Sequence, residues 1–175
     1  MKEFIKDLII ALAIVVAITF VIKPTIVKET SMKPNLQNNN YLFVFKLAYV
    51  TKEHPDHGDI IVFKSDIDKD DGSGKKLLIK RVIGTEGDTI EIHDDMVIRN
   101  GEVLDEEYIM DEEFDSGTPG YIEEFTVPDD EIFVMGDHRT VSLDSRDSSV
   151  GTIDEDSIVG KAVFRIFPFN EIGKI

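Results

Sequence analysis

The feature that most constrains this chain is an apolar segment close to its N-terminus. Residues Leu8 to Ile22 include no charged side chain, and Phe4-Ile5 before them and Pro24 to Val27 after them extend the apolar stretch. A helix that crosses the hydrocarbon core of a bilayer needs about 20 mostly apolar residues. With its flanks the segment reaches that length, so we predict one N-terminal transmembrane helix.

A cleaved secretory signal peptide is the alternative explanation, because its apolar region has about the same length. The small-x-small site Ala17-Ile18-Thr19 falls inside the apolar run, where cleavage is not expected. We therefore predict an uncleaved anchor over residues 1–27. Two lysines precede the helix and one follows it, and this slight positive excess favours a cytoplasmic N-terminus with residues 28–175 outside.

Composition narrows the function classes for the rest of the chain. The 175 residues are 42% hydrophobic and 31% charged, as in globular proteins, and their formal net charge is −16. So acidic a chain repels nucleic-acid phosphates, which argues against DNA or RNA as a partner. The absence of cysteine excludes disulfides, cysteine-based zinc sites and thiol nucleophiles.

Strand-like runs separated by turn residues dominate the chain after residue 27. The runs are rich in β-branched and aromatic residues, and Asn100-Gly101 is typical of a tight hairpin turn. We expect strands over 41–45, 58–63, 76–84, 88–92, 96–99, 102–104, 131–135 and 158–167. Residues 105–128 are acidic and contain Gly117-Thr118-Pro119-Gly120, so we expect an irregular excursion there. The predicted fold class is mainly β, an antiparallel sheet domain preceded by the transmembrane helix.

Ser31 and Lys80, in the β-rich part, form a candidate nucleophile and base. A serine hydroxyl needs a nearby base, and burial can lower the pKa of a lysine, near ~10.4 in water, until the neutral amine can serve. Strand alternation places Lys80 on one face with Leu78 and Val82. Arg81 then points the other way and stays charged. The alternative for Lys80 is a lysine that protects a strand edge from aggregation.

A third segment supplies polar groups for such a site. Directly after the apolar run Phe133 to Met135, residues 136–146 hold two acids, two arginines, two serines and a histidine. This density behind a buried strand predicts a hydrogen-bonded site floor. We expect Asp144 and Arg146 to form a charge pair, and the Ser142 hydroxyl to hydrogen-bond beside the lysine amine.

Three stretches of the chain together resemble the signature motifs of bacterial type I signal peptidases. They follow an N-terminal anchor in the order of that family, and they read Ser31-Met32-x-Pro34, Lys80-Arg81-Val82-Ile83-Gly84-x-x-Gly87-Asp88 and Gly136-Asp137-x-Arg139-x-x-Ser142-x-Asp144-Ser145-Arg146. The closing Ile158-Val159-Gly160-Lys161-Ala162 and Phe167-Pro168-Phe169 fit as well, so the resemblance covers nearly the whole chain. Three ordered motifs are far more specific than one.

The resemblance implies a membrane-anchored serine endopeptidase that removes N-terminal signal peptides from exported preproteins. Ser31 would attack the scissile carbonyl, and neutral Lys80 would take its proton and return it to the leaving amine. Ser142 would orient the Lys80 amine, while Asp144 and Arg146 would brace the site. The reaction needs no cofactor, and we expect no metal site.

The resemblance also implies how the substrate binds. Met32, Leu36 and Ile79 match positions that in the family line shallow pockets for small residues, which explains cleavage at Ala-x-Ala-like sites. The family adds its substrate to the protein as a β-strand. The expected partners are preproteins with signal peptides and the lipid bilayer. The catalytic domain, residues 28–175, is expected on the extracytoplasmic side of the cell membrane, and the oligomeric state stays open.

Two residues depart from the family pattern. Glu29 stands where glycine or serine is usual, two positions before the nucleophile, and we expect its side chain to turn away from the developing negative charge. His138 stands where asparagine is common. Glu29 keeps a second function open, namely a weakly active or inactive signal-peptidase-like membrane protein that binds exported chains.

Two further patterns have competing explanations. A Ser-His-Asp triad through His138 is geometrically poor, because adjacent strand residues such as Asp137 and His138 point apart. Asp66 to Gly72 resembles a calcium loop, but its glycine is one position late and Leu77 stands where the closing glutamate belongs. We therefore expect a solvated hairpin tip over Asp66 to Gly72.

Overall fold

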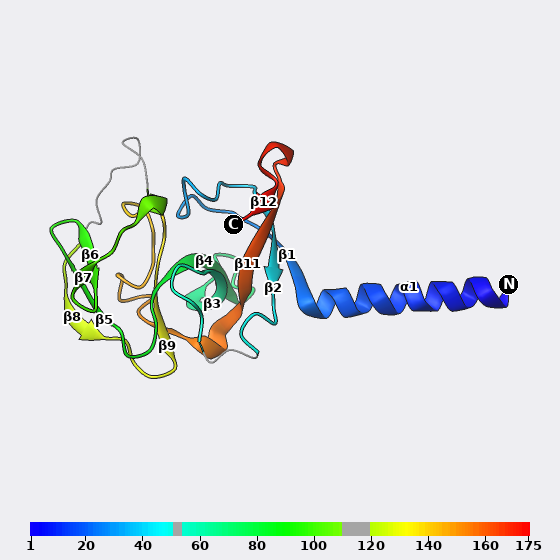
Figure 1. The fold of residues 1–175 in the computed structure, drawn as a ribbon, viewed down its shortest axis with the longest axis horizontal. Helices are drawn as coiled ribbons and strands as arrows, with labels where there is room; N and C mark the ends of the chain where they lie inside the picture. Colours follow the sequence, from blue (N-terminus) through cyan, green and yellow to red (C-terminus); the bar gives the residue numbers. More distant parts are fainter. Residues whose placement is uncertain (51–53, 110–119) are drawn as a thin grey trace.

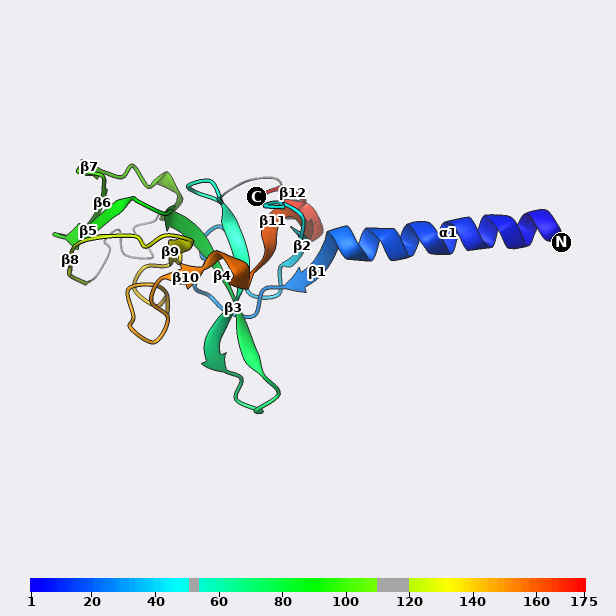
Figure 2. The same cartoon turned by 90° about the horizontal axis from the view of Figure 1, so that it is seen from below.

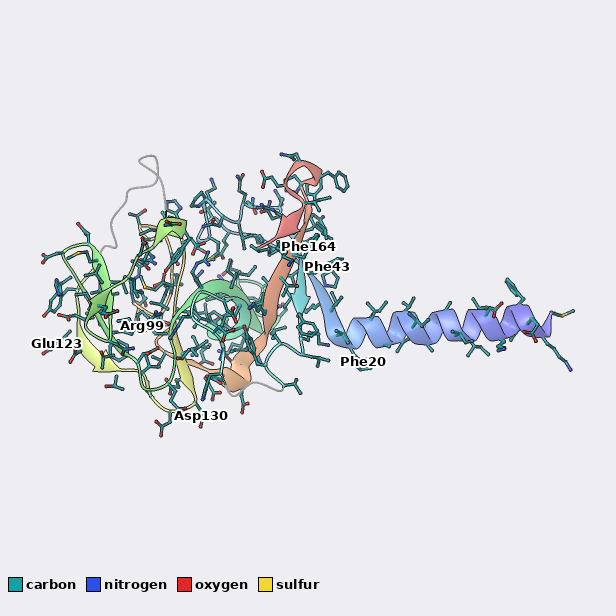
Figure 3. All side chains as sticks on the ribbon, viewed as in Figure 1. Phe20, Phe43, Arg99, Glu123, Asp130 and Phe164 are labelled. Atoms are coloured by element: carbon teal, nitrogen blue, oxygen red, sulfur yellow. The ribbon has the colours of Figure 1, made fainter. Side chains whose placement is uncertain are left out.

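A computed structural model describes residues 1–50, 54–109 and 120–175 of the chain. The N-terminal helix α1 (Lys2–Val21) has 20 residues and extends from the β-structure as a single rod (Figure 1). None of its residues is buried, and apolar side chains such as Phe20 project from it on all sides (Figure 3). The helix is long and apolar enough to cross a membrane. The prediction of one N-terminal apolar helix is confirmed.

The helix ends earlier than the apolar stretch of the sequence does. We expected Pro24 to Val27 to continue the apolar segment, but strand β1 (Ile22–Ile26) follows directly after Val21. Strand β1 pairs antiparallel with β2 (Tyr41–Phe45). Proline ends helices and is tolerated in an edge strand, which accounts for the change at this point. The sheet therefore begins at Ile22, and the division into domains at residue 27 stays a prediction.

Two antiparallel sheets make up most of the remaining described chain. The further strands of the larger sheet are β3 (Ile60–Asp68), β4 (Lys75–Gly84), β9 (Glu131–Met135), β10 (Ile153–Asp154), β11 (Ile158–Phe167) and β12 (Gly173–Lys174). The smaller sheet contains β5 (Thr89–His93), β6 (Met96–Arg99), β7 (Glu102–Val103) and β8 (Ile122–Thr126). Short 3₁₀ turns are η1 (Glu107–Ile109), η2 (Glu155–Ser157) and η3 (Phe169–Glu171).

The strand order places the helix and the smaller sheet at opposite ends of the molecule. The larger sheet runs β1-β2-β11-β3-β4-β9-β10, with β12 added to β11, and the smaller runs β7-β6-β5-β8. Figure 1 shows the smaller sheet at the end far from α1. The mainly β fold class predicted from the sequence is confirmed.

The expected irregular excursion over residues 105–128 is wrong for part of its length. Strand β8 lies within it and pairs with β5, and η1 forms a short turn. Strand β8 is an acidic edge strand, and its side chains do not alternate regularly between exposed and half-buried. Its sequence therefore gave no strand pattern, and its conformation depends on pairing with β5. Residues 110–119 of the excursion lie outside the described residues.

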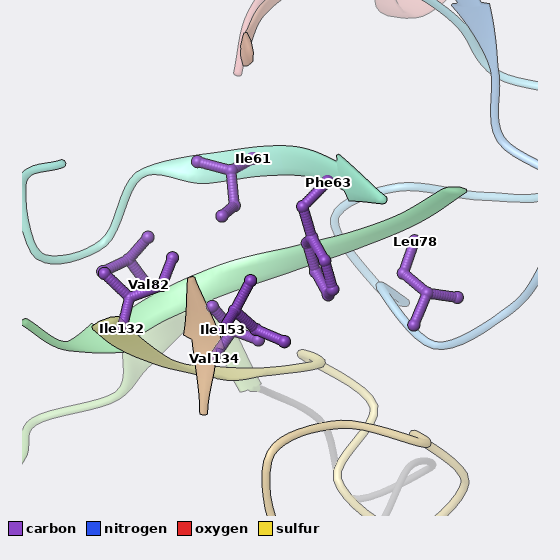
Figure 4. Packing of buried hydrophobic residues seen from close by; sticks show 7 residues of the cluster. All are labelled: Ile61, Phe63, Leu78, Val82, Ile132, Val134 and Ile153. Atoms are coloured by element: carbon purple, nitrogen blue, oxygen red, sulfur yellow. The ribbon is translucent and has the colours of Figure 1, made fainter. Parts of the chain in front are cut away.

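Strand alternation sorts the apolar side chains into distinct cores. Along β9, Ile132 and Val134 face one cluster, while Phe133 and Met135 face a second cluster that includes residues of the smaller sheet. Figure 4 shows the first cluster, which consists of Ile61, Phe63, Leu78, Val82, Ile132, Val134 and Ile153. Burial of each such side chain contributes about 1.5–3 kcal/mol. These cores pack against β4, which lies between β3 and β9 in the interior of the larger sheet.

Strands β3 and β4 also extend beyond the cores as a hairpin arm. Figure 2 shows this arm projecting from the rest of the β-structure. Its tip closes through backbone hydrogen bonds between Lys69 and the Gly72 to Gly74 stretch, and its side chains are exposed. The structure has the predicted hairpin tip but not its bounds over Asp66 to Gly72, because β3 continues to Asp68 and the turn spans residues 69–74.

Candidate active site

Ser31 lies in a tight turn that is anchored in a third apolar core. The Leu36 N–H donates to the Met32 carbonyl at 2.7 Å, which closes one helical turn directly after the serine. Met32 and Leu36 are 1% and 0% exposed and pack in a cluster with Leu42 and Ala162. Because both side chains are locked in this core, the packing of the neighbouring residues helps to fix the position of the serine.

Lys80 lies on the buried face of β4. Leu78, Lys80 and Val82 are all buried in alternation, and Lys80 is only 1% exposed. Its partner across the strand pair is Ile61. Arg81 lies between the buried positions, with its side chain on the other face. The face assignment made from the sequence is confirmed.

The fold brings the two candidate residues into contact. Lys80 Nζ lies 2.7 Å from Ser31 Oγ, although 49 positions separate the residues in the sequence. Ser31 is 8% exposed, so the contact is largely shielded from water. Burial lowers the pKa of Lys80 below its ordinary value, and it outweighs the carboxylates of Asp144, Glu29 and Asp137, which act in the opposite direction. A lysine in this setting can be neutral and can act as a base.

Asp144 and Arg146 form the predicted charge pair. Arg146 Nε donates to Asp144 Oδ1 at 2.8 Å, and a second guanidinium nitrogen donates to Oδ2 at 2.9 Å. The Gly136 N–H also donates to Oδ2 at 2.9 Å. Burial favours the neutral acid, but the hydrogen bonds and charge of Arg146 prevail and keep the pKa of Asp144 below its ordinary value. The carboxylate therefore ties the arginine to the backbone at the end of β9.

Gly136 is the point where the site floor and the nucleophile turn meet. A Cβ at this position would collide with the carbonyl oxygen of Ser31 and with the Ser142 side chain. The His138 N–H donates to the same Ser31 carbonyl at 3.0 Å. The turn that carries Ser31 therefore rests directly on residues 136–138, and this close approach requires glycine.

Ser142 lies beside Gly136 rather than in contact with the lysine. Its Oγ is buried and makes no hydrogen bond of ordinary geometry to the described chain, although it is close enough to Asp144 to help lower the pKa of that carboxyl. No hydrogen bond between Ser142 and Lys80 is present in the described residues. The orienting role of Ser142 stays a prediction.

A cavity of about 550 Å³ opens beside Ser31. Its walls come from β1 and the segment after it on one side, and from the first half of β4 with the hairpin tip on the other. The lining residues are Thr25, Ile26, Val27, Lys28, Glu29, Ser31, Met32, Val62, Lys69, Asp70, Asp71, Lys76, Leu77, Leu78 and Ile79. Met32 and Ile79, two of the predicted substrate-binding residues, are among them. Leu36 lies below the cavity in the core, and the binding roles of all three stay predictions.

Both walls of the cavity have unpaired strand edges. In the part of the chain that the structure describes, β1 pairs with β2 alone, so its other edge is open there. β4 pairs with β3 over Lys75 to Arg81, whereas its pairing with β9 begins only at Arg81. Among the described residues, no strand occupies the β9-side edge of residues 75–80, and this edge could pair with an added strand.

A second layer of ion pairs, which sequence reasoning missed, supports the site from behind. Arg81 binds Asp137 through two hydrogen bonds of 2.8 and 2.7 Å, and Asn35 donates to the same carboxylate at 2.9 Å. Glu106 binds Arg139 in the same two-pronged way, and Arg139 Nε donates to the Gly136 carbonyl. These pairs connect the nucleophile turn, β4 and the segment before η1 to the residues after β9.

Little in the sequence identifies these partners in advance. Glu106 lies in a stretch read as an irregular excursion, and acidic residues are frequent throughout the chain. Within residues 1–50, 54–109 and 120–175, no group of three or more histidine, aspartate or glutamate side chains is placed to hold an ion. The site consists of a hydroxyl, an amine and paired charges.

Comparison with known proteins gives a consistent result. The family described as signal peptidase, peptidase S26, matches residues 1–167. The chain is 35% identical over 179 residues to a signal peptidase I of Bacillus licheniformis, covering 98% of this chain and 91% of that protein. It is 37% identical over 177 residues to signal peptidase I P of Bacillus subtilis subsp. natto, covering 97% and 91%. A crystal structure of a signal peptidase I from Enterococcus faecalis is 30% identical, covers 62% of this chain and 97% of that chain, and has a TM-score of 0.49.

The chain belongs to the signal peptidase family, peptidase S26. Its relatives are type I enzymes, and the chain is accordingly a hydrolase of the serine endopeptidase class. Enzymes of this kind act on secreted preproteins that carry signal peptides. The resemblance stated from the three motifs is confirmed.

Proposed function

We propose that the chain is a membrane-anchored endopeptidase that cleaves signal peptides after small residues, with Ser31 as nucleophile and neutral Lys80 as general base. The observation that carries the proposal is the 2.7 Å contact between Lys80 Nζ and Ser31 Oγ. A general base acts within about 2.6–3.2 Å of the atom it deprotonates. Burial supplies the second requirement, because it lowers the pKa of Lys80 and so favours the neutral amine.

The first half of the reaction forms an acyl-enzyme. Lys80 Nζ accepts the hydroxyl proton while Ser31 Oγ bonds to the scissile carbonyl carbon, and the carbonyl electrons move to oxygen. The Ser31 N–H donates to no group of the described chain, so it is available to this oxyanion. When the tetrahedral intermediate collapses, the C–N bond breaks and the Lys80 ammonium gives its proton to the leaving amine.

The second half releases the signal peptide. Lys80 Nζ accepts a proton from water, the water oxygen bonds to the acyl carbon, and the Ser31 oxygen leaves with the proton that the lysine returns. In both halves the lysine is charged only transiently. Burial favours its neutral form before each step, whereas the carboxylates of Asp144 and Asp137 favour the ammonium that each step creates.

The residues around the pair hold it in place. Asp144 and Arg146 fix the chain after β9, on which the Ser31 turn rests through His138 and Gly136. We infer that the Ser142 hydroxyl, which is buried beside Gly136, orients the lysine amine as the substrate enters. A base and a nucleophile held within a few tenths of an ångström of reacting geometry give much of the rate enhancement.

The cavity beside Ser31 suits an extended substrate. A chain lying between the open edges of β1 and of residues 75–80 would add a strand and place alternate side chains on opposite sides. Met32 and Ile79 line this cavity, and we infer that they form the shallow pockets for small residues at the first and third positions before the cut. Helix α1 would hold this cavity close to the bilayer, with the N-terminus in the cytoplasm and the catalytic domain outside.

The test uses the purified full chain in detergent and a preprotein with an Ala-x-Ala site. We expect cleavage after the second alanine, and a loss of roughly 10⁴-fold or more in both Ser31→Ala and Lys80→Ala. His138→Ala is the control for a histidine-based triad and should keep most of the activity. Cleavage that survives Lys80→Ala would refute the lysine base. Binding of the preprotein without cleavage by the unaltered chain would favour the inactive alternative.

A further inference from the structure

Glu29 is a charged group in the wall of the substrate cavity. Its side chain is exposed and lines the same cavity as Ser31, Met32 and Ile79. It lies two residues before the nucleophile. No ion pair to Glu29 is formed within residues 1–50, 54–109 and 120–175, so the carboxylate is open to a partner in the cavity.

Unlike the carboxylate of Glu29, the charges at the far end of the cavity balance one another. Along the β4 wall, the residues from Lys76 to Ile79 lead from the hairpin tip toward Lys80. Lys76 and the hairpin tip therefore lie at the end of the cavity that is remote from Ser31. There Lys76 Nζ lies 3.1 Å from Asp70 Oδ1, and Lys69 and Asp71 add one charge of each sign. The wall at that end therefore neither attracts nor repels a charged side chain of the substrate on balance.

Lys28, the neighbour of Glu29, does not cancel it at the reacting centre. Lys28 lines the same cavity, but the main charges that act on Lys80 include Glu29 and not Lys28, so the charge of Glu29 is the one that reaches the dyad. The Glu29 carboxylate is close enough to Lys80 to oppose the effect of burial on the pKa of that lysine, second only to Asp144 among the charges that do so. The unpaired negative charge therefore lies at the end of the cavity where the bond is cut.

We propose that Glu29 is a specificity residue, which favours preproteins with a basic side chain next to the scissile bond and disfavours those with an acidic one. The inference rests on the proposed function and narrows its substrate class. The relevant positions are the residue between the two small residues of the site and the first residue after the cut. Neither is restricted in size by the pockets at Met32 and Ile79, so each is free to carry a charge.

The expected effect follows from the exposure of Glu29. Exposed ion pairs are weak in water, and a change from lysine to glutamate in the substrate exchanges attraction for repulsion. We therefore expect kcat/KM to favour lysine over glutamate by about two- to tenfold. Glu29→Gln should abolish this preference, and Glu29→Lys should reverse it.

The pH profile supplies a second readout, which a purely structural role would not move. The groups that act on Lys80 are Asp144, Glu29 and Asp137, which raise its pKa, and Arg146, which lowers it together with burial. Removal of the Glu29 charge should move the acid limb of the kcat/KM profile to lower pH. Glu123→Gln is the matched control, because Glu123 is exposed on β8 in the smaller sheet, far from β1 (Figure 3).

The experiment compares preproteins that differ only by lysine, glutamine or glutamate at these two positions, competed in one reaction with the full chain. A second set carries the same changes six residues before the cut and should show no preference. Binding of fluorescently labelled versions to Ser31→Ala measures the same preference without cleavage, with Ser31→Ala/Glu29→Gln as its comparison. Activity that survives Ser31→Ala or Lys80→Ala would refute the dyad. The binding comparison would still decide the role of Glu29, because it does not depend on cleavage. An equal lysine preference with and without Glu29 would overturn the inference.

Discussion

The two faces of strand β4 place their basic side chains in different environments. Lys80 lies on one face, buried, and the hydroxyl of Ser31 is the hydrogen-bond partner of its amine. Arg81 lies on the other face, with two hydrogen bonds to Asp137 and its guanidinium 4.1 Å from the centre of the Tyr108 ring. The neighbouring residues are one position apart, so the alternation of the strand alone separates these environments.

The difference shows how one strand can provide both a base and a brace. An amine without a directly bonded carboxylate can lose its proton when it is buried, whereas a guanidinium stays charged in proteins and forms two-pronged pairs. Lys80 is thereby suited to move protons. Arg81 is suited to fix Asp137, which also accepts from Asn35 of the nucleophile turn.

The largest effect should come from making the two faces alike. Lys80→Arg puts a permanent cation on the Ser31 face, so no base remains, and we expect preprotein cleavage to fall by roughly 10⁴-fold or more. Arg81→Lys is the matched exchange on the other face. It keeps the charge but loses one of the two charged hydrogen bonds to Asp137, each worth about 1.5–3 kcal/mol, so we expect a loss of roughly ten- to a hundredfold. Equal losses in the two variants, measured as kcat/KM, would show that the faces are not distinct in function.

A smaller effect should follow from disturbing the contact between the nucleophile turn and the site floor. In Gly136→Ala the new Cβ collides with the Ser31 carbonyl and with Ser142, so the turn must shift. A displacement of about 1 Å costs on the order of 10²-fold in rate. We expect most of that loss in kcat, because the turn carries the nucleophile, whereas the cavity walls formed by β1 and β4 keep their positions. Gly151→Ala is the control in a positive-φ turn away from the site, and it should affect unfolding rather than kcat.

The sequence predicted the features that arise from local patterns. Alternation around Leu78 and Val82 placed Lys80 on the buried face, and the density of polar residues after β9 indicated the floor that Asp144 and Arg146 form. The contact of Ser31 with Lys80 depends on strand order across the sheet, so the residues alone gave the two as a candidate pair, and the resemblance to a known family gave the stronger reason to expect their contact. The pairing of Glu106 with Arg139 spans 33 positions and follows no local period, which is why it appears only in the structure.

The smallest expected effect is on the free energy of unfolding, which is lowered by the burial of Lys80. In the folded chain the pKa of Lys80 lies below its unfolded value of 10.5, so between these two values the unfolded chain binds more protons. The free energy of unfolding therefore rises with pH through this window, and below the folded pKa the full cost of the buried ammonium applies. Lys80→Met fills a similar volume without a charge and lacks this dependence.

We expect Lys80→Met to melt at a higher temperature than the unaltered chain at neutral pH, by roughly 2–4 °C for each kcal/mol. The difference between the two melting temperatures should shrink as the pH rises toward and past 10.5, because the unfolded lysine then loses its proton as well and folding no longer releases one. Comparison of two variants at each pH removes the contribution of every other titrating group. A constant difference across the pH series would mean that Lys80 is charged in the folded chain, and it would contradict both the assignment of a neutral base and the contrast between the two faces of β4.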